Sequence, residues 1–211
     1  MGTCVIFCAG EFDVPAEPVG REDLVVAADG GLDHLKKLGL KPDLILRDFD
    51  SLGYVPEGAE VYPVEKDDTD AMLALRRGLK LGYRRFVIYG GMDGPRVDHT
   101  VANFQTLQFA ADQGAKACLV GVRQIAAVVK NGSICFPSDA AGTVSVFCMG
   151  EPARGVSIRG LKYDLTDGCL TPGFPLGVSN SFVGVPSQIE VKDGSLLVIY
   201  DRGNGLPEAP L

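Results

Sequence analysis

The sequence predicts an α/β fold in two parts: a Rossmann-like, mostly parallel sheet with flanking helices, followed by an antiparallel β-sandwich. Over about the first 120 residues, short apolar runs alternate with helix-like segments, a pattern typical of a parallel sheet covered by helices. After about residue 122, helix formers become scarce and short apolar runs follow one another. Glycine makes up 27 of the 211 residues, so tight turns are expected. These observations place one domain at residues 1–122 and a second at 123–211.

Five buried strands are expected in the first part, because each is a short apolar run. They cover Thr3–Cys8, Leu24–Ala28, Leu44–Leu46, Phe86–Tyr89 and Ala117–Val120. Three helices are expected between them, each followed by the glycine that commonly stands just past a helix C-terminus. They cover Leu32–Leu38, Thr69–Leu81 and His99–Gln113. Ligands of such a sheet bind at the carboxyl ends of its strands.

Short strands separated by turn signals predict the sandwich of the second part. The expected strands cover Ile125–Val129, Ser133–Phe136, Thr143–Phe147, Val156–Ile158, Val178–Val183, Gln188–Val191 and Ser195–Tyr200. Asn131-Gly132 and Asp193-Gly194 are expected to form hairpin turns, because both central positions of such a turn need a positive φ.

The composition excludes several classes of protein. Twenty basic against 27 acidic residues give a net charge of −7, whereas nucleic-acid-binding domains usually carry a basic excess. No apolar run reaches the ~18 residues that a membrane span needs. A secretory signal has basic residues before its apolar stretch, and here no basic residue precedes the first apolar stretch. A cytoplasmic protein without nucleic-acid or membrane partners is therefore expected.

The six cysteines include no CxxC pair, and most lie in apolar, strand-like segments. Buried free thiols are therefore expected. Since His34 and His99 are the only histidines, a zinc site built from His and Cys is not expected.

Chemically active residue types follow the ends of the predicted strands. Ala28-Asp29-Gly30-Gly31 comes after the second strand and opens a helix. Its glycines allow a close approach of backbone to a ligand, and a helix N-terminus favours phosphate. Taken alone, an Asp-Gly-Gly segment is more often a simple turn.

Two acidic segments come next along the chain. Asp48 and Asp50 follow the third strand, and residues i and i+2 of an extended segment point the same way. Two converging carboxylates repel unless a cation neutralises them, and Mg²⁺ prefers such oxygen ligands and usually brings substrate phosphates with it. The segment 66–70, Lys-Asp-Asp-Thr-Asp, contains more acids than helix capping by Asp68 or Thr69 requires. A shared metal or phosphate role is therefore favoured.

A glycine-rich loop, residues 90–99, follows the Phe86–Tyr89 strand. Its backbone N–H groups and the planar fork of Arg96 suit phosphate oxygens. Asp98 is a candidate helix cap. A lone histidine at a helix start, such as His99, is more often structural than catalytic, and Asn103 lies one turn later on the same helix face. Since GxSxG and GxxxxGK[ST] are both absent from the sequence, metal-assisted phosphoryl-type transfer is the chemistry favoured.

These segments, in this order, resemble the thiamine pyrophosphokinase (thiamine diphosphokinase) family. The resemblance spans residues 28 to 182 and rests on Ala28–Gly31, Pro42-Asp43, Asp48–Ser51, Lys66–Asp70, Gly94–His99, Ala102-Asn103 and Gly177–Phe182. It implies an N-terminal α/β catalytic domain and a C-terminal β-sandwich that binds thiamine. It also implies transfer of the pyrophosphoryl group of ATP to the thiamine hydroxyl, with release of AMP.

The resemblance further implies roles for individual residues. Asp48, Asp50 and Asp70 would hold Mg²⁺ against the triphosphate, and Arg96 and Thr69 would steady phosphates. Asp98 would orient substrate or help to take the hydroxyl proton. The remaining ATP-binding residues would be Asp29, Gly30, Gly31 and Asn103.

On the same resemblance, Ser179, Asn180 and Phe182 would bind thiamine. The resemblance also implies a homodimer, in which these residues would reach the active site of the partner subunit. A net-acidic pocket also suits the thiazolium cation.

Three other functions stay open from the sequence. A haloacid-dehalogenase-type phosphatase also has an Asp-x-Asp motif, but its lysine and acidic pair come much later in the sequence. Only sixteen residues separate Asp50 from Asp67 here, which is too few for that class. A different Mg²⁺-dependent phosphotransferase or glycosyltransferase is a second alternative. A thiamine- or nucleotide-binding protein without catalysis is the third, since Arg47 and Pro95 replace glycines common in the family, and Pro95 fixes φ and removes an N–H donor.

Overall fold

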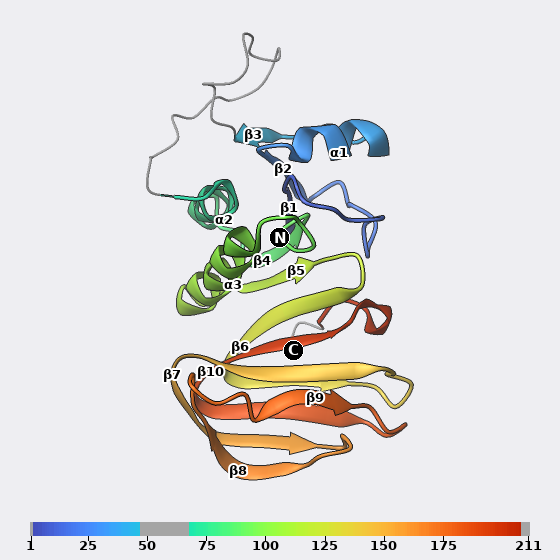
Figure 1. Cartoon of the computed structure of the whole chain (residues 1–211). Helices are drawn as coiled ribbons and strands as arrows, with labels where there is room; N and C mark the ends of the chain where they lie inside the picture. Colours follow the sequence, from blue (N-terminus) through green and yellow to red (C-terminus); the bar gives the residue numbers. More distant parts are fainter. Residues whose placement is uncertain (1, 47–67, 208–211) are drawn as a thin grey trace.

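The computed structural model describes residues 2–46 and 68–207 (Figure 1). Their elements, in chain order, are β1 (Cys4–Phe7), β2 (Leu24–Ala28), α1 (Gly31–Leu38), β3 (Leu44–Leu46), α2 (Asp70–Lys80), β4 (Arg85–Tyr89), α3 (Val97–Asp112), β5 (Lys116–Val120), β6 (Gln124–Phe136), β7 (Thr143–Arg159), β8 (Leu165–Leu170), β9 (Gly177–Ser181), β10 (Ser187–Asp201) and the 3-10 turn η2 (Arg202–Asn204).

The strands form one ten-stranded mixed sheet in the order β3-β2-β1-β4-β5-β6-β10-β7-β8, with β9 paired to β7. The pairs among β1 to β5 are parallel. Antiparallel pairing begins where β5 meets β6, with Cys118 opposite Ala127 and Val120 opposite Ile125. The hydrogen-bond ladder therefore continues without a break from the first half of the chain into the second.

The predicted fold class is wrong. A separate Rossmann-like parallel sheet with its own helices is not found, because the N-terminal strands are one end of a mixed sheet. Strands also predominate, since the described residues contain three α-helices against ten strands. The division at residue 122 stays a prediction, and β5 and β6 pair directly across it.

The predicted hairpin at Asn131-Gly132 is also wrong, because β6 continues through these residues to Phe136. Asn131 does have a positive φ of 47°. Its Oδ1 accepts a hydrogen bond from the Gly194 amide at 2.9 Å, where the register between β10 and β6 shifts between Val191 and Ser195. Both predicted turn signals therefore form a bulge between two long strands, which bends the sheet without reversing the chain.

Two apolar cores lie on opposite faces of the sheet, as the alternation of β1 shows. Ile6 packs toward the face with Leu75 of α2 and Leu107 of α3. Phe7 packs toward the other face, whose core includes Leu35 of α1 and continues to Tyr200 of β10. This second core joins both halves of the chain and contributes to one continuous structure.

None of the helices in the described residues is both long enough and apolar enough to span a membrane. The end of α1 has a local cause. Gly39, with φ of 67°, ends α1 in the left-handed conformation that favours glycine.

The six cysteines are free, and they differ in exposure: Cys4, Cys8 and Cys118 are buried, whereas Cys135 and Cys169 are exposed. Burial raises the pKa of each buried thiol from 9.0 to about 12. Ellman's reagent at pH 8 is therefore expected to modify Cys135 and Cys169 and to spare these three until the chain unfolds.

The same shift links stability to pH. Because unfolding returns the three pKa values to about 9, the stabilisation is present below pH 9 and is lost as the pH rises toward 12. Denaturant titrations at pH 8 and pH 10 check this sign, and equal midpoints would contradict it.

Candidate active site

The loops that follow β1, β2 and β4 form the candidate active site. Backbone hydrogen bonds hold them together: the Gly10 amide donates to Gly90 O at 2.9 Å, and the Asp29 amide donates to Leu46 O at 2.9 Å. The first bond joins the β1 and β4 loops, and the second joins the end of β2 to the end of β3. The carboxyl ends of neighbouring parallel strands thus meet at one edge, where α/β sheets bind ligands.

Gly30 and Gly31, two of the predicted nucleotide-binding residues, are required by the packing of α1 on β1. A Cβ at Gly31 would lie 1.8 Å from the Phe7 carbonyl oxygen, and one at Gly30 would lie 2.9 Å from Cβ of Ala9. Asp29 has a φ of 51°, which Asp tolerates better than most residues. This turn starts α1 at the carboxyl edge, where first-turn amides are donors for an anion.

Thr69 caps α2, and Asp68 reinforces the start of the same helix. Thr69 has extended backbone, with φ of −73° and ψ of 155°, and its Oγ1 accepts from the Met72 amide at 3.3 Å. The Asp68 carboxylate lies 2.6 Å from the guanidinium of Arg76. Both residues therefore have a structural role beside any role in binding phosphate.

Asp29 and Asp70 act on the same buried thiol. Burial is the main cause that raises the pKa of Cys8 to about 12, and the negative charges of Asp70 and Asp29 raise it further. Asp70 begins α2 and Asp29 follows β2, and the negative charges of both act on a thiol that lies directly after β1.

Asp48 and Asp50, the other two predicted metal ligands, lie outside the described residues. Within residues 2–46 and 68–207, no group of three or more His, Cys, Asp or Glu side chains could hold a metal ion. The three-aspartate ligand set therefore stays a prediction.

Arg96 and Asp98 face each other at the start of α3. Arg96 Nη2 lies 2.5 Å from Asp98 Oδ2, and both side chains are exposed. The hydrogen bond from Arg96 lowers the pKa of Asp98, so Asp98 is a carboxylate at neutral pH and a weak base. Asp98 can therefore accept a hydrogen bond as an anion, and Arg96 can exchange its bond with Asp98 for one with a phosphate.

Asn103 is buried and holds the glycine-rich loop. Its Nδ2 donates to Gly91 O at 2.8 Å. This bond fixes the loop against α3, so Asn103 shapes the candidate nucleotide site by positioning backbone.

The sequence analysis missed the loop after β1. His34 Nε2 lies 3.0 Å from Gly10 O, and its ring packs edge-on against Phe12 at 4.8 Å. The available signal was Gly10, two residues after the end of the first predicted strand. Arg202 of η2 joins the loop after β1 to the loop after β5, because it donates hydrogen bonds to Val14 O and, at 3.1 Å, to Gly121 O.

The three predicted thiamine-binding residues lie on or beside β9. Asn180 is buried, and its side chain is engaged by backbone: Oδ1 accepts from the Tyr163 and Ser181 amides at 3.0 and 2.9 Å, and Nδ2 donates to Tyr163 O at 2.7 Å. Ser179 is exposed and has a φ of 62°. Phe182 is half-buried and packs edge-on against Phe136 with ring centroids 5.0 Å apart.

Within one chain, these residues lie far from the loops that follow β1, β2 and β4. β9 pairs with β7, and the strands between β1 and β7 in the sheet are β4, β5, β6 and β10. At ~4.8 Å per strand, the path along the sheet is roughly 24 Å. Figure 1 likewise places β9 at the end of the molecule opposite α1.

Two family models match the chain, one on each half. The model described as "Thiamin pyrophosphokinase, catalytic domain" matches residues 17–119, and "Thiamin pyrophosphokinase, vitamin B1 binding domain" matches residues 133–196. The chain belongs to the thiamin pyrophosphokinase family. The family predicted from the short motifs, and its class of enzyme, are confirmed.

Solved structures of thiamin pyrophosphokinases share the fold. Thiamine pyrophosphokinase from Bacillus subtilis has a TM-score of 0.81 and 24% identity, over 94% of this chain and 98% of that one. Thiamin pyrophosphokinase from Geobacillus thermodenitrificans has a TM-score of 0.80 and 25% identity, over 95% of this chain and 97% of that one. Thiamin pyrophosphokinase from Candida albicans has a TM-score of 0.74 and 16% identity, over 95% of this chain and 89% of that one. No curated protein matches the sequence.

The two matches enclose both groups of predicted thiamin pyrophosphokinase site residues. Asp29, Asp70 and Asn103 fall inside the catalytic match, and Asn180 and Phe182 fall inside the vitamin B1-binding match. The roles of the individual residues stay predictions.

Proposed function

We propose that this chain transfers the pyrophosphoryl group of ATP to the hydroxyl of thiamine and forms thiamine diphosphate and AMP. The observation that carries the proposal is the presence of both family domains in one chain, at residues 17–119 and 133–196. A thiamin pyrophosphokinase is the enzyme that this family membership supports. ATP as the donor and Mg²⁺ as the cofactor are the finer parts of the proposal.

Mg²⁺ would be held by Asp48, Asp50 and Asp70, and when bound it would neutralise charge on the triphosphate. The negative charges of Asp70 and Asp29 both act on the Cys8 thiol, and this excess of negative charge supports a cation at this edge. Asp70 begins α2, so its backbone position is fixed by a capped helix. The chain's own contribution is to position these carboxylates before the nucleotide arrives.

The nucleotide phosphates would bind along the loops of β2 and β4. Gly30 and Gly31 bring the amides of α1 to the edge, and Asn103 holds the β4 loop in place. Arg96 would exchange its bond with Asp98 for phosphate oxygens, whose two-point geometry matches the guanidinium. Asp98, released from Arg96, would accept a hydrogen bond from the thiamine hydroxyl and orient it.

Thiamine would bind between two copies of the chain, with Ser179, Asn180 and Phe182 contributed by the partner. Two observations support a homodimer with the site at the subunit interface. The two groups of residues are far apart within one chain, and large apolar side chains are exposed around β9. These are Tyr163, Phe174, Leu176, Val178, Val183 and Val185. Clustered exposed apolar residues commonly mark an interface.

Sedimentation velocity tests the dimer. Leu176→Asp is expected to yield monomers and to lower turnover, because a charge would enter the apolar contact. Leu81→Asp is the matched control, since Leu81 is exposed at the far end of α2. An unchanged dimer in Leu176→Asp, or a wild-type monomer with full activity, would refute the shared site.

Phosphorus NMR of the protein with ATP, Mg²⁺ and thiamine tests the reaction, with a thiamine-free control. Thiamine-dependent AMP together with thiamine diphosphate is expected. ADP with thiamine monophosphate would mean a single-phosphoryl kinase, and inorganic phosphate without thiamine would mean a phosphatase. Thiamine binding without turnover would mean a binding protein.

A cytoplasmic location stays a prediction from the sequence.

Phe182→Ala is expected to weaken thiamine binding by about 1–3 kcal/mol, because one aromatic face is lost from the site. The ring also packs on Phe136, so Phe182→Leu serves as a control that keeps apolar packing. Titration calorimetry with thiamine separates the effects. Equal thiamine affinity in both variants and wild type would remove Phe182 from the site.

A further inference from the structure

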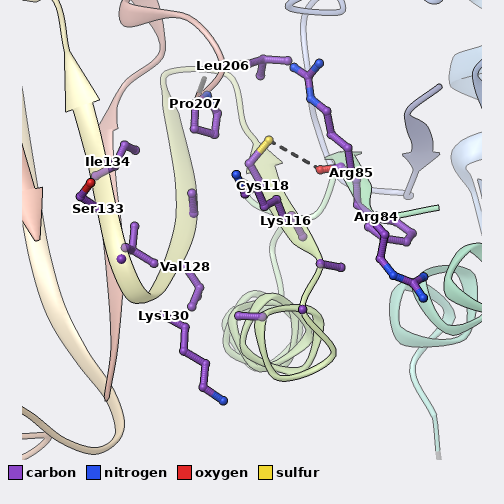
Figure 2. Close-up of a pocket in the computed structure, with 18 of the residues that line it drawn as sticks. Arg84, Arg85, Lys116, Cys118, Val128, Lys130, Ser133, Ile134, Leu206 and Pro207 are labelled. Atoms are coloured by element: carbon purple, nitrogen blue, oxygen red, sulfur yellow. Dashed lines mark hydrogen bonds between the residues drawn. The ribbon is translucent and has the colours of Figure 1, made fainter. Parts of the chain in front are cut away.

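We propose that a cavity at the amino ends of β4 and β5 binds a small amphipathic anion, a carboxylate attached to an apolar body. The cavity has a volume of about 640 Å³ and lies between β5, β6, the end of α3 and the C-terminal segment (Figure 2). Small-molecule sites commonly fall between 300 and 1,000 Å³, so this volume is in the expected range. The proposal does not depend on the reaction proposed above.

The cavity is distinct from the candidate active site. It is lined at Arg85 and Lys116, where β4 and β5 begin, whereas the candidate site follows Tyr89, where β4 ends. At ~3.3 Å per residue, a strand of this length separates the two edges by roughly 13 Å.

Diverging strands create the cavity. β5 pairs with β6 only from Cys118 to Val120, opposite Ile125 to Ala127. Beyond Ala127, β6 continues in pairing with β10 on its other side, Val128 opposite Leu197 and Lys130 opposite Ser195. The edge of β6 that faces the cavity therefore has no strand partner there, among the residues that the structure describes, and it presents backbone polar groups.

The walls of the cavity are mainly apolar. Phe86, Ala117, Ala127, Val129 and Ile134 contribute from three strands, and Leu206 and Pro207 contribute from the C-terminal segment. An apolar wall of this size suits an alkyl chain or an aromatic ring.

The charges at the cavity are of one sign. Within the described part of the chain, the charged side chains that line it are Arg84, Arg85, Lys116 and Lys130. This concentration of cations occurs in a protein whose net charge is −7. An anionic ligand is the complement of such a lining.

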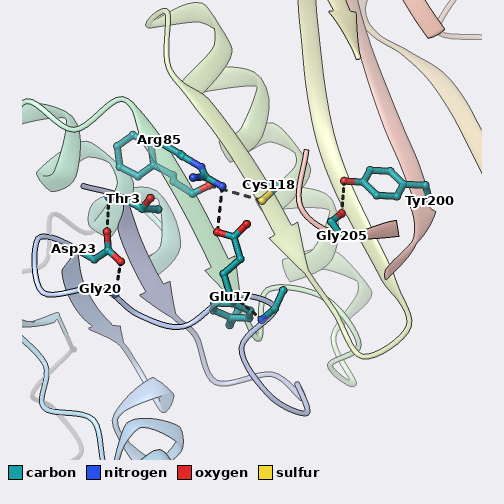
Figure 3. A network of polar contacts seen from close by, with 11 residues as sticks. Thr3, Glu17, Gly20, Asp23, Arg85, Cys118, Tyr200 and Gly205 are labelled. Carbon is teal, nitrogen blue, oxygen red and sulfur yellow. Dashed lines mark hydrogen bonds and ion pairs between the residues drawn. The ribbon is translucent and has the colours of Figure 1, made fainter. Parts of the chain in front are cut away.

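Lys116 is the best placed of the four to bind an anion. Arg85 lies 3.3 Å from Glu17 (Figure 3), and Lys130 lies 2.6 Å from Asp112. Arg84 donates to the carbonyl of Tyr83 at 2.8 Å. Across residues 2–46 and 68–207, no ion pair is found for Lys116. Lys116 is exposed, and partial desolvation lowers the pKa of its ammonium group, so a carboxylate partner would stabilise the cation.

Isothermal titration calorimetry with decanoate tests the proposal. Decanoate is expected to bind at one site per chain, and decan-1-ol and decylammonium, which share the apolar body, are expected to bind at least tenfold more weakly. Lys116→Gln is expected to weaken decanoate binding roughly tenfold, the usual effect of one charge-assisted contact. Lys36→Gln, an exposed lysine of α1 away from the cavity, is the matched control. Equal affinity for decanoate and decan-1-ol, or no effect of Lys116→Gln, would overturn the proposal.

A second variant tests the apolar part. Ala111 is half-buried at the end of α3 and lines the cavity, so Ala111→Phe is expected to fill the space and reduce decanoate affinity, whereas Ala111→Ser is not. Saturating MgATP and thiamine are expected to leave the affinity unchanged. Displacement of decanoate by MgATP would identify the cavity as the nucleotide site. Dissociation of a dimer by decanoate would identify it as a subunit contact. Either result would overturn the proposal.

Discussion

Asp70→Asn is expected to lower kcat by roughly 100- to 1,000-fold while the chain stays folded. Asp70 is the described member of the proposed metal-binding set, and a bound metal contributes several kcal/mol of charge stabilisation in phosphoryl transfer. The substitution keeps the shape of the side chain and removes its charge. Steady-state formation of AMP at varied Mg²⁺ measures the effect, and higher Mg²⁺ is expected to restore only part of the rate.

Asp33→Asn is the matched control for Asp70→Asn. Both aspartates lie in the first turn of a helix, so both variants lose the same favourable interaction with the helix dipole, about 0.3–1 kcal/mol. Asp33 is exposed and pairs with Lys36 at 3.5 Å on the surface. Its variant is expected to retain nearly full turnover. Similar losses in both variants, or near-full turnover of Asp70→Asn, would refute the metal role of Asp70.

Gly31→Ala is expected to lower the free energy of unfolding by roughly 3 kcal/mol or more. Its new Cβ would lie 1.8 Å from the Phe7 carbonyl oxygen and 2.4 Å from the Phe7 carbonyl carbon. Since the obstacle is backbone of a buried central strand, α1 must move away from β1. Urea unfolding measures the stability, and ATP affinity is expected to fall as well because the start of α1 shifts.

Gly39→Ala separates this packing effect from the general cost of losing a glycine. Gly39 has a φ of 67°, and nothing lies within 4 Å of its Cβ position. Its substitution is therefore expected to cost only the left-handed backbone conformation, about 1 kcal/mol. An equal loss of stability in both variants would show that α1 adapts at Gly31 without difficulty.

The sequence allowed the family and many elements to be predicted, because their signals are local. Thr69, for example, is a residue type that caps helices, and it caps α2. Continuity of the sheet could not be predicted, because the pairing of Cys118 with Ala127 depends on which strands become neighbours. The hairpin predicted at Asn131-Gly132 is wrong for the same reason: a positive φ suits both a turn and a bulge, and only the partner strand decides between them.

The candidate site shows a similar division. Asp29, Gly30 and Gly31 were predicted together from one short segment. Their packing against β1 was not predicted, since Phe7 lies more than twenty residues earlier in the sequence. The role of Asn180 in thiamine binding stays a prediction, and the structure adds that its side chain bonds the Tyr163 backbone, a contact that only tertiary structure reveals.

The continuous sheet and the core that runs from Leu35 to Tyr200 have a consequence for how the protein opens. Regions that share one ladder and one core tend to open together rather than as independent cooperative units. We therefore expect amide hydrogen exchange at Cys118–Val120 to require opening of the β5–β6 ladder through global unfolding of the chain. The two halves are accordingly expected to behave as a single foldon, in which a substitution in either half lowers the protection of amides in the other.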